Sequence, residues 1–133
     1  MRLIRAVMAV CCLLTPMTAA VGTADAASGA SPVGSWQMLD GQARVRVTMC
    51  GDGTQLCALL TGLSGGARTP ANIRLLNDYV VANAIQAARN SWHGVVRFGG
   101  QTAEGDIALV SQNTITVSGC RLGMCKTLQF ERV

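Results

Sequence analysis

Residues 114–132 read TITVSGCRLGMCKTLQFER, and this stretch has the pattern of two strands joined by a turn. Apolar and polar side chains alternate on both sides of Arg121–Met124, which we expect to form a four-residue turn. A period of two is typical of a strand that buries one face. The stretch therefore predicts a β-hairpin. The side chains predicted to face inward are Ile115, Val117, Leu128 and Phe130.

A second hairpin is predicted nearer the N-terminus. Ala43–Cys50 alternates in the same way, and Gly51–Thr54 is rich in turn residues. Glycine accepts positive φ angles, and aspartate accepts hydrogen bonds from nearby backbone. We expect Cys57–Leu63 to be the returning strand. The inward side chains of the first strand are predicted to be Val45, Val47 and Met49.

Four cysteines flank the two predicted turns: Cys50, Cys57, Cys120 and Cys125. An even number of cysteines in a small exported domain indicates disulfides. Directly opposed residues in a non-hydrogen-bonded strand pair lie about 4.5–5.5 Å apart, which a disulfide can bridge. We therefore predict Cys50–Cys57 and Cys120–Cys125 bonds, on solvent-facing sides of their hairpins. A zinc site is disfavoured, because zinc ligand pairs are usually about two to four residues apart.

Further strands are predicted outside the two hairpins. Residues 82–89 could instead form a helical turn, and residues 64–76 form the longest loop. About eight short strands separated by turns are typical of a barrel or a sandwich. We predict an all-β fold, a small antiparallel meander β-barrel of about eight strands. The additional strand candidates are Ser35–Leu39, Tyr79–Ala84, Trp92–Phe98 and Glu104–Val110.

The two ends of the predicted domain are expected to meet. In a closed eight-stranded meander the first and last strands are antiparallel neighbours. Trp36 lies near the start of the first strand and Arg132 near the end of the last one. We predict that Arg132 stacks over Trp36 and closes one mouth of the barrel, a cation–π pairing of about 0.5–2 kcal/mol.

The N-terminus is predicted to be a signal peptide, residues 1–26. Two arginines precede an uncharged apolar run at residues 6–21, and the small residues Ala24 and Ala26 flank Asp25. This layout is the one that a signal peptidase reads. The run is shorter than the roughly 20 apolar residues of a membrane-spanning helix. We expect residues 27–33 to be a flexible leader, residues 34–133 to be the barrel domain, and the mature protein to be periplasmic or secreted, without stable membrane insertion.

The charged residues predict no catalytic or nucleic-acid site. The full sequence carries a net charge of +4, and loss of two arginines and one aspartate with residues 1–26 leaves +3. Nucleic-acid binding usually shows a clustered basic stripe, which the sequence lacks. His93 falls on the polar face of its strand, and Glu104 and Asp106 share an outward face. Such groups are usually solvated, so we expect neither an enzyme nor a metal or cofactor site.

The mature chain resembles a family of exported bacterial proteins, domain-of-unknown-function family 2147, and more generally the calycin (lipocalin-like) barrels. The resemblance implies a lipocalin-like barrel in the bacterial envelope, and it implies no catalytic residues. The stretches that carry it are Gly34-Ser35-Trp36, Val47-Thr48-Met49-Cys50, Leu56-Cys57-Ala58, Trp92-His93-Gly94, Val117-Ser118-Gly119-Cys120 and Phe130-Glu131-Arg132.

The predicted interior is almost wholly apolar, which favours a binding module. An eight-stranded barrel either fills with side chains or holds one small ligand, so the partner would be a small apolar molecule. The alternative is a protein-interaction module, such as a protease inhibitor whose leader at residues 27–33 enters the protease. Ligand-lining residues would be Met38, Val47, Met49, Trp92, Val96, Phe98, Ile107, Val117 and Phe130.

Overall fold

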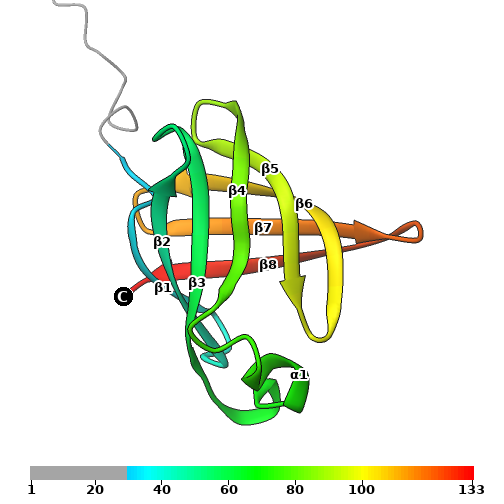
Figure 1. The fold of residues 1–133 in the computed structure, drawn as a ribbon. Helices are drawn as coiled ribbons and strands as arrows, with labels where there is room; N and C mark the ends of the chain where they lie inside the picture. Colours follow the sequence, from blue (N-terminus) through cyan, green and yellow to red (C-terminus); the bar gives the residue numbers. More distant parts are fainter. Residues whose placement is uncertain (1–29) are drawn as a thin grey trace, which may run out of the picture.

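The structure, a computed structural model, describes residues 30–133 (Figure 1). The predicted signal peptide and residues 27–29 of the predicted leader lie outside the described residues. Within residues 30–133, eight antiparallel strands close into a barrel, each paired with its neighbours along the chain. The predicted all-β meander barrel is confirmed. The strands are β1 (Gly34–Met38), β2 (Ala43–Cys50), β3 (Gln55–Leu63), β4 (Tyr79–Ala88), β5 (Ser91–Phe98), β6 (Gln101–Ser111), β7 (Thr114–Arg121) and β8 (Met124–Arg132).

The barrel closes between β1 and β8, where Trp36 is opposite Arg132 and Met38 is opposite Phe130. Turns of an up-and-down barrel alternate between its two ends. The first end, called the leader end here, carries residues 30–33, the C-terminus and the β2–β3 turn. The second, called the tip end, carries the β5–β6 turn, the β7–β8 turn and the long β3–β4 connection.

The core forms where the period-two pattern predicts it. Every side chain predicted to face inward is either in the buried cluster or packed against it. Trp36, Leu56 and Leu60 are the largest side chains with almost no exposure. Glycines occupy inward positions where strands approach closely. At Gly94, for example, a Cβ would lie 2.9 Å from Ala84, which is too close for a side chain. The alternation therefore sets both the faces of the strands and the filling of the barrel.

The β7–β8 turn is tighter than predicted. Arg121 and Met124 belong to the strands, so the turn consists of Leu122 and Gly123 instead of four residues. Both have positive φ angles, 51° and 77°. Two successive positive φ angles define the type I′ turn, whose twist matches that of the flanking strands. In Figure 1 this hairpin extends beyond the other strands.

Two other local predictions are corrected. β4 is one strand from Tyr79 to Ala88, so the helical alternative for residues 82–89 is wrong. Its irregularity is a break in strand register around Asn83, which has a φ angle of 53°. Asparagine tolerates this left-handed region better than most residues. The predicted loop at residues 64–76 contains a 3-10 turn, η1 (Gly65–Ala67), and a short helix, α1 (Pro70–Ile73).

Both predicted disulfides are confirmed. Cys120 is directly opposite Cys125, with a Cα–Cα distance of 4.0 Å. The Cys50–Cys57 bond spans 6.0 Å between Cα atoms and is diagonal, because Thr48 is the residue opposite Cys57. The prediction of directly opposed cysteines is therefore wrong for this pair.

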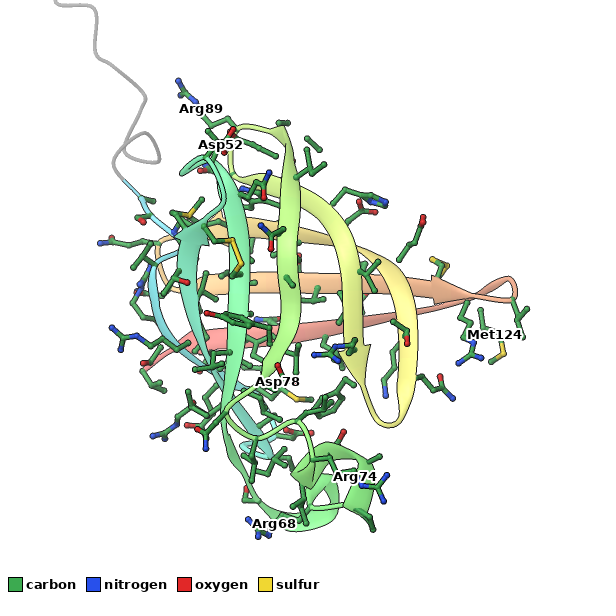
Figure 2. The ribbon with its side chains drawn as sticks, viewed as in Figure 1. Asp52, Arg68, Arg74, Asp78, Arg89 and Met124 are labelled. Atoms are coloured by element: carbon green, nitrogen blue, oxygen red, sulfur yellow. A yellow bond between two sulfur atoms is a disulfide. The ribbon has the colours of Figure 1, made fainter. Side chains whose placement is uncertain are left out.

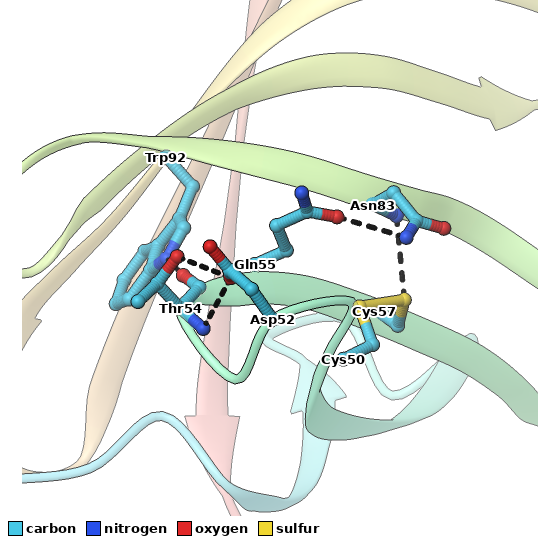
Figure 3. The surroundings of a disulfide bond; sticks show 7 residues. All are labelled: Cys50, Asp52, Thr54, Gln55, Cys57, Asn83 and Trp92. Carbon is cyan, nitrogen blue, oxygen red and sulfur yellow. Dashed lines mark hydrogen bonds between the residues drawn. A yellow bond between two sulfur atoms is a disulfide. The ribbon is translucent and has the colours of Figure 1, made fainter.

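Cys57 is also not on a solvent-facing surface, since only 5% of it is exposed. Figure 3 shows the reason: Asn83 of β4 lies over the bond, and its backbone N–H donates to Cys57 Sγ at 3.3 Å. The Asn83 side chain donates to Gln55 at 2.8 Å. The Trp92 indole donates to the carbonyl of Thr54 at 2.9 Å. The first disulfide is thus built into the leader end of the barrel.

Candidate binding cavity

The barrel interior holds a small cavity of about 60 Å³ with an apolar surface. One water needs about 10–15 Å³, and a cavity of about 150 Å³ accommodates benzene. Side chains therefore fill most of the interior. The cavity is enclosed by residues from all eight strands, among them Trp36, Val47, Leu60, Val81, Ile107 and Phe130.

A much larger concavity, of about 920 Å³, lies at the tip end. Ligand pockets commonly measure about 300–1,000 Å³, so this concavity, called the mouth here, has room for a small molecule. Its wall is formed by β5, the β5–β6 turn, the start of β6 and the β7–β8 hairpin. Residues of that wall include Gly99, Gln101, Arg121, Met124 and Lys126.

Four apolar side chains line both the interior cavity and the mouth, and they are called the floor here: Val96, Phe98, Val117 and Leu128. All four are only partly buried. They come from β5, β7 and β8, at positions where the inward face approaches the tip end. The two spaces therefore adjoin each other at these four side chains.

The predicted ligand-lining residues divide by position along the barrel. Met49 and Trp92 line neither space, because they lie near the leader end, where the Trp92 indole binds the β2–β3 turn. The others line the interior cavity, and three of them also line the mouth. Those that line the interior cavity are Met38, Val47, Val96, Phe98, Ile107, Val117 and Phe130.

Arg121 and Lys126 are mouth residues that the sequence analysis missed. Continuing the alternation from Val117 to Arg121, and from Leu128 back to Lys126, puts both on the inward face. The alternation therefore indicates both positions, whereas the predicted four-residue turn places Arg121 outside the strand. Both side chains are exposed, and neither forms an ion pair with another residue between 30 and 133.

Asn72 of α1 was also missed. It is buried, and its Nδ2 donates to the carbonyl of Ala67 at 2.9 Å while its Oδ1 accepts from the Gly99 N–H at 2.7 Å. This side chain ties the β3–β4 connection to the β5–β6 turn at the edge of the mouth. Only the folded chain brings residues 72 and 99 together, so the local sequence carried no signal.

The leader end is sealed by Arg132, whose guanidinium carbon lies 4.4 Å from the centre of the Trp36 ring. The predicted closing pair is therefore present. Arg132 also donates to the carbonyls of Val33 at 2.8 Å, Ser31 at 2.7 Å and Gln112 at 3.0 Å. The Trp36 indole donates to a further leader carbonyl, that of Pro32, at 2.8 Å. Residues 31–33 of the predicted leader are thus bonded to the barrel.

His93 forms a surface cluster with two carboxylates on β6. Its Nδ1 lies 2.7 Å from Asp106 Oδ1, and its Nε2 lies 3.6 Å from Glu104 Oε2. The hydrogen bond to Asp106 raises the pKa of His93 above its ordinary 6.5. All three side chains are exposed and on the outer face, away from the mouth. No group of three or more metal-ligating side chains suited to a metal occurs within residues 30–133.

The fold and the cavities define an eight-stranded, disulfide-stapled barrel, sealed at one end and hollowed at the other. The disulfides indicate an oxidising, non-cytoplasmic location. Among residues 30–133, no helix is long and apolar enough to cross a membrane. Comparisons with family models, curated proteins and solved structures give no match for this chain.

Proposed function

We propose that this protein is a non-catalytic binding module of the cell envelope that holds a small apolar ligand at the mouth. Export by the signal peptide at residues 1–26, to the periplasm or the exterior, is part of the proposal. Membership of domain-of-unknown-function family 2147 is a further part, supported by the stretches quoted above. The observation that carries the proposed function is the floor, which is apolar on both sides and adjoins a concavity of ligand size.

The physical basis is burial of apolar surface. Each Å² of apolar surface removed from water contributes about 25 cal/mol, and a ligand resting on the floor would cover the half-buried side chains of Val96, Phe98, Val117 and Leu128. The interior cavity is too small for a whole ligand, but it gives the floor side chains space to rearrange. Part of a ligand could then pass between the floor side chains of β5 and those of β7 and β8, and the barrel would not need to widen.

Binding of the neutral fluorescent probe N-phenyl-1-naphthylamine tests the proposal. Val117→Trp fills the floor with a bulky ring, and Ile85→Trp places the same ring on the exposed outer face of β4 as a matched control. We expect binding to the parent and to the control, and a loss of about tenfold or more in Val117→Trp, which corresponds to at least 1.4 kcal/mol. Equal binding by all three proteins would reject the mouth as the site.

Native mass spectrometry of the protein from its own host provides an independent readout. We expect a bound apolar molecule that is retained by the Ile85→Trp protein and lost from the Val117→Trp protein. A parent protein that carries no ligand from its host and binds no apolar probe contradicts the proposed function.

A further inference from the structure

The tip of the β7–β8 hairpin presents exposed apolar side chains at the rim of the mouth. Leu122 is 93% exposed and Met124 is 80% exposed, more than any other large apolar side chain between residues 30 and 133. Figure 2 shows Met124 at the far extremity of the hairpin, apart from the β3–β4 connection that carries Arg68 and Arg74. Isolated exposed apolar residues are ordinary on a protein surface, but these two occupy one projecting point.

The backbone at this point favours polar residues and glycine. Type I′ turns have positive φ at both central positions, where asparagine and glycine are preferred. Leu122 holds the first position with a φ angle of 51°. A bulky apolar residue in this region is uncommon, and it gains no burial in return. Neither the preference of the turn nor burial within the barrel accounts for a leucine at this position.

The tip is held rigid and is positively charged. The Cys120–Cys125 bond closes the hairpin one residue pair behind Arg121 and Met124. Arg121 and Lys126 flank the apolar pair, and the sequence contains no acidic residue from position 107 to position 130. The nearest carboxylate along the sheet is Glu104, opposite Cys120, and it lies 3.6 Å from His93.

We propose that this tip docks on the surface of an anionic lipid membrane. Leu122 and Met124 enter the boundary between headgroups and acyl chains, and Arg121 and Lys126 contact lipid phosphates. Apolar insertion and basic flanks are the two contributions that interfacial anchors combine. Docking in this way brings the mouth, which Arg121, Met124 and Lys126 line, to the lipid. The inference goes beyond the proposed function, since it concerns attachment to a membrane and not the ligand held in the mouth.

Co-sedimentation with lipid vesicles tests the inference, using the exported protein with both disulfides intact. The vesicles are phosphatidylcholine alone or phosphatidylcholine mixed with phosphatidylglycerol. The double variant Leu122→Ser/Met124→Ser removes the apolar tip. Its matched control, Ile85→Ser/Val110→Ser, removes two side chains of the barrel wall that are 65% and 58% exposed. Arg121→Gln and Arg46→Gln form a second matched pair, each removing one exposed arginine.

We expect the parent to bind the phosphatidylglycerol vesicles and to lose binding as salt rises. Salt shortens the range over which surface charges attract each other, to about 10 Å at about 0.1 M. The tip double variant should bind at least about tenfold more weakly, because it loses the apolar surface that the two side chains bury in the membrane. The effect is moderate because each side chain buries only part of its surface. Arg121→Gln should weaken binding about fivefold. Both wall controls should match the parent.

Three results would overturn the inference: no binding to phosphatidylglycerol vesicles, equal binding to the two vesicle types, or equal binding by the tip and wall double variants. Because the probe assay with Val117→Trp uses no vesicles, failure of membrane docking is distinguishable from failure of ligand binding.

Discussion

The two ends of the barrel use the same kind of disulfide-closed hairpin for different purposes. At the leader end the Cys50–Cys57 bond is covered by Asn83, and the neighbouring turn is bonded to Trp92. At the tip end Cys120 and Cys125 are exposed, and the residues between them contact little else. A disulfide therefore stabilises the core in one place and holds a projecting surface in the other.

The polar groups at the two ends differ in the same way. Arg132 at the leader end donates to three backbone carbonyls and covers Trp36. Lys126 lies on the inward face of the same strand, six residues earlier, without an ion-pair partner among residues 30–133. Groups whose interactions are complete stabilise the fold, whereas groups left exposed at a concave end are available to a partner.

Removal of the two disulfides should give the largest contrast. Cys50→Ala/Cys57→Ala is expected to lower the free energy of unfolding by about 3–4 kcal/mol, from loop entropy and from an N–H of Asn83 that loses its acceptor. Cys120→Ala/Cys125→Ala should cost about 2 kcal/mol, from loop entropy alone. Urea unfolding followed by tryptophan fluorescence measures both. Equal losses would show that burial of Cys57 adds no stability.

The two cations of β8 provide the next comparison. Arg132→Ala should destabilise the fold by about 4 kcal/mol, because it removes three hydrogen bonds of about 1 kcal/mol each and a cation–π contact. Lys126→Ala should change stability by less than about 0.5 kcal/mol, since it is an exposed side chain. Thermal unfolding of both variants measures the two losses of stability. A larger loss for Lys126→Ala would contradict the assignment of the two ends.

Asn72 tests whether the β3–β4 connection supports the mouth. Asn72→Ala should cost about 2 kcal/mol, because the Gly99 N–H loses its acceptor and the buried Ala67 carbonyl loses one of its two donors. The effect should appear in hydrogen exchange as faster exchange of the Gly99 amide. Unchanged exchange there would mean that α1 does not hold the β5–β6 turn.

The smallest predicted effect on stability comes from the pair His93 and Asp106 on the outer face of the barrel. The carboxylate of Asp106 raises the pKa of His93, so the pair should stabilise the fold below the unfolded pKa of about 6.5. This contribution is lost as the pH rises through the folded pKa. An NMR titration of the single histidine should give a pKa above 6.5, and Asp106→Asn should lower it. A pKa that this substitution leaves unchanged would contradict the contact.

The sequence predicted the features that depend on strand faces and strand order better than those that depend on contacts between distant segments. Period-two alternation identified the core, the closing pair Trp36 and Arg132, and both disulfides, because each of these depends on strand faces and strand order. It did not predict the cover over Cys57, which comes from a register break in β4 at Asn83. It missed Asn72 for a related reason, since its partners come from distant segments. The alternation also extends to Arg121 and Lys126, but the predicted four-residue turn included Arg121, and no role was predicted for Lys126.

If ligands bind at the tip end and the leader end is structural, an added ligand should perturb only the tip end. An NMR titration of the isotope-labelled protein with N-phenyl-1-naphthylamine measures this residue by residue. We predict amide shift changes at Val96, Phe98, Val117, Lys126 and Leu128, with none at residues 31–36 or 50–57. Shift changes concentrated at the leader end, or an absence of changes at saturating probe, would rule out the mouth as the binding site.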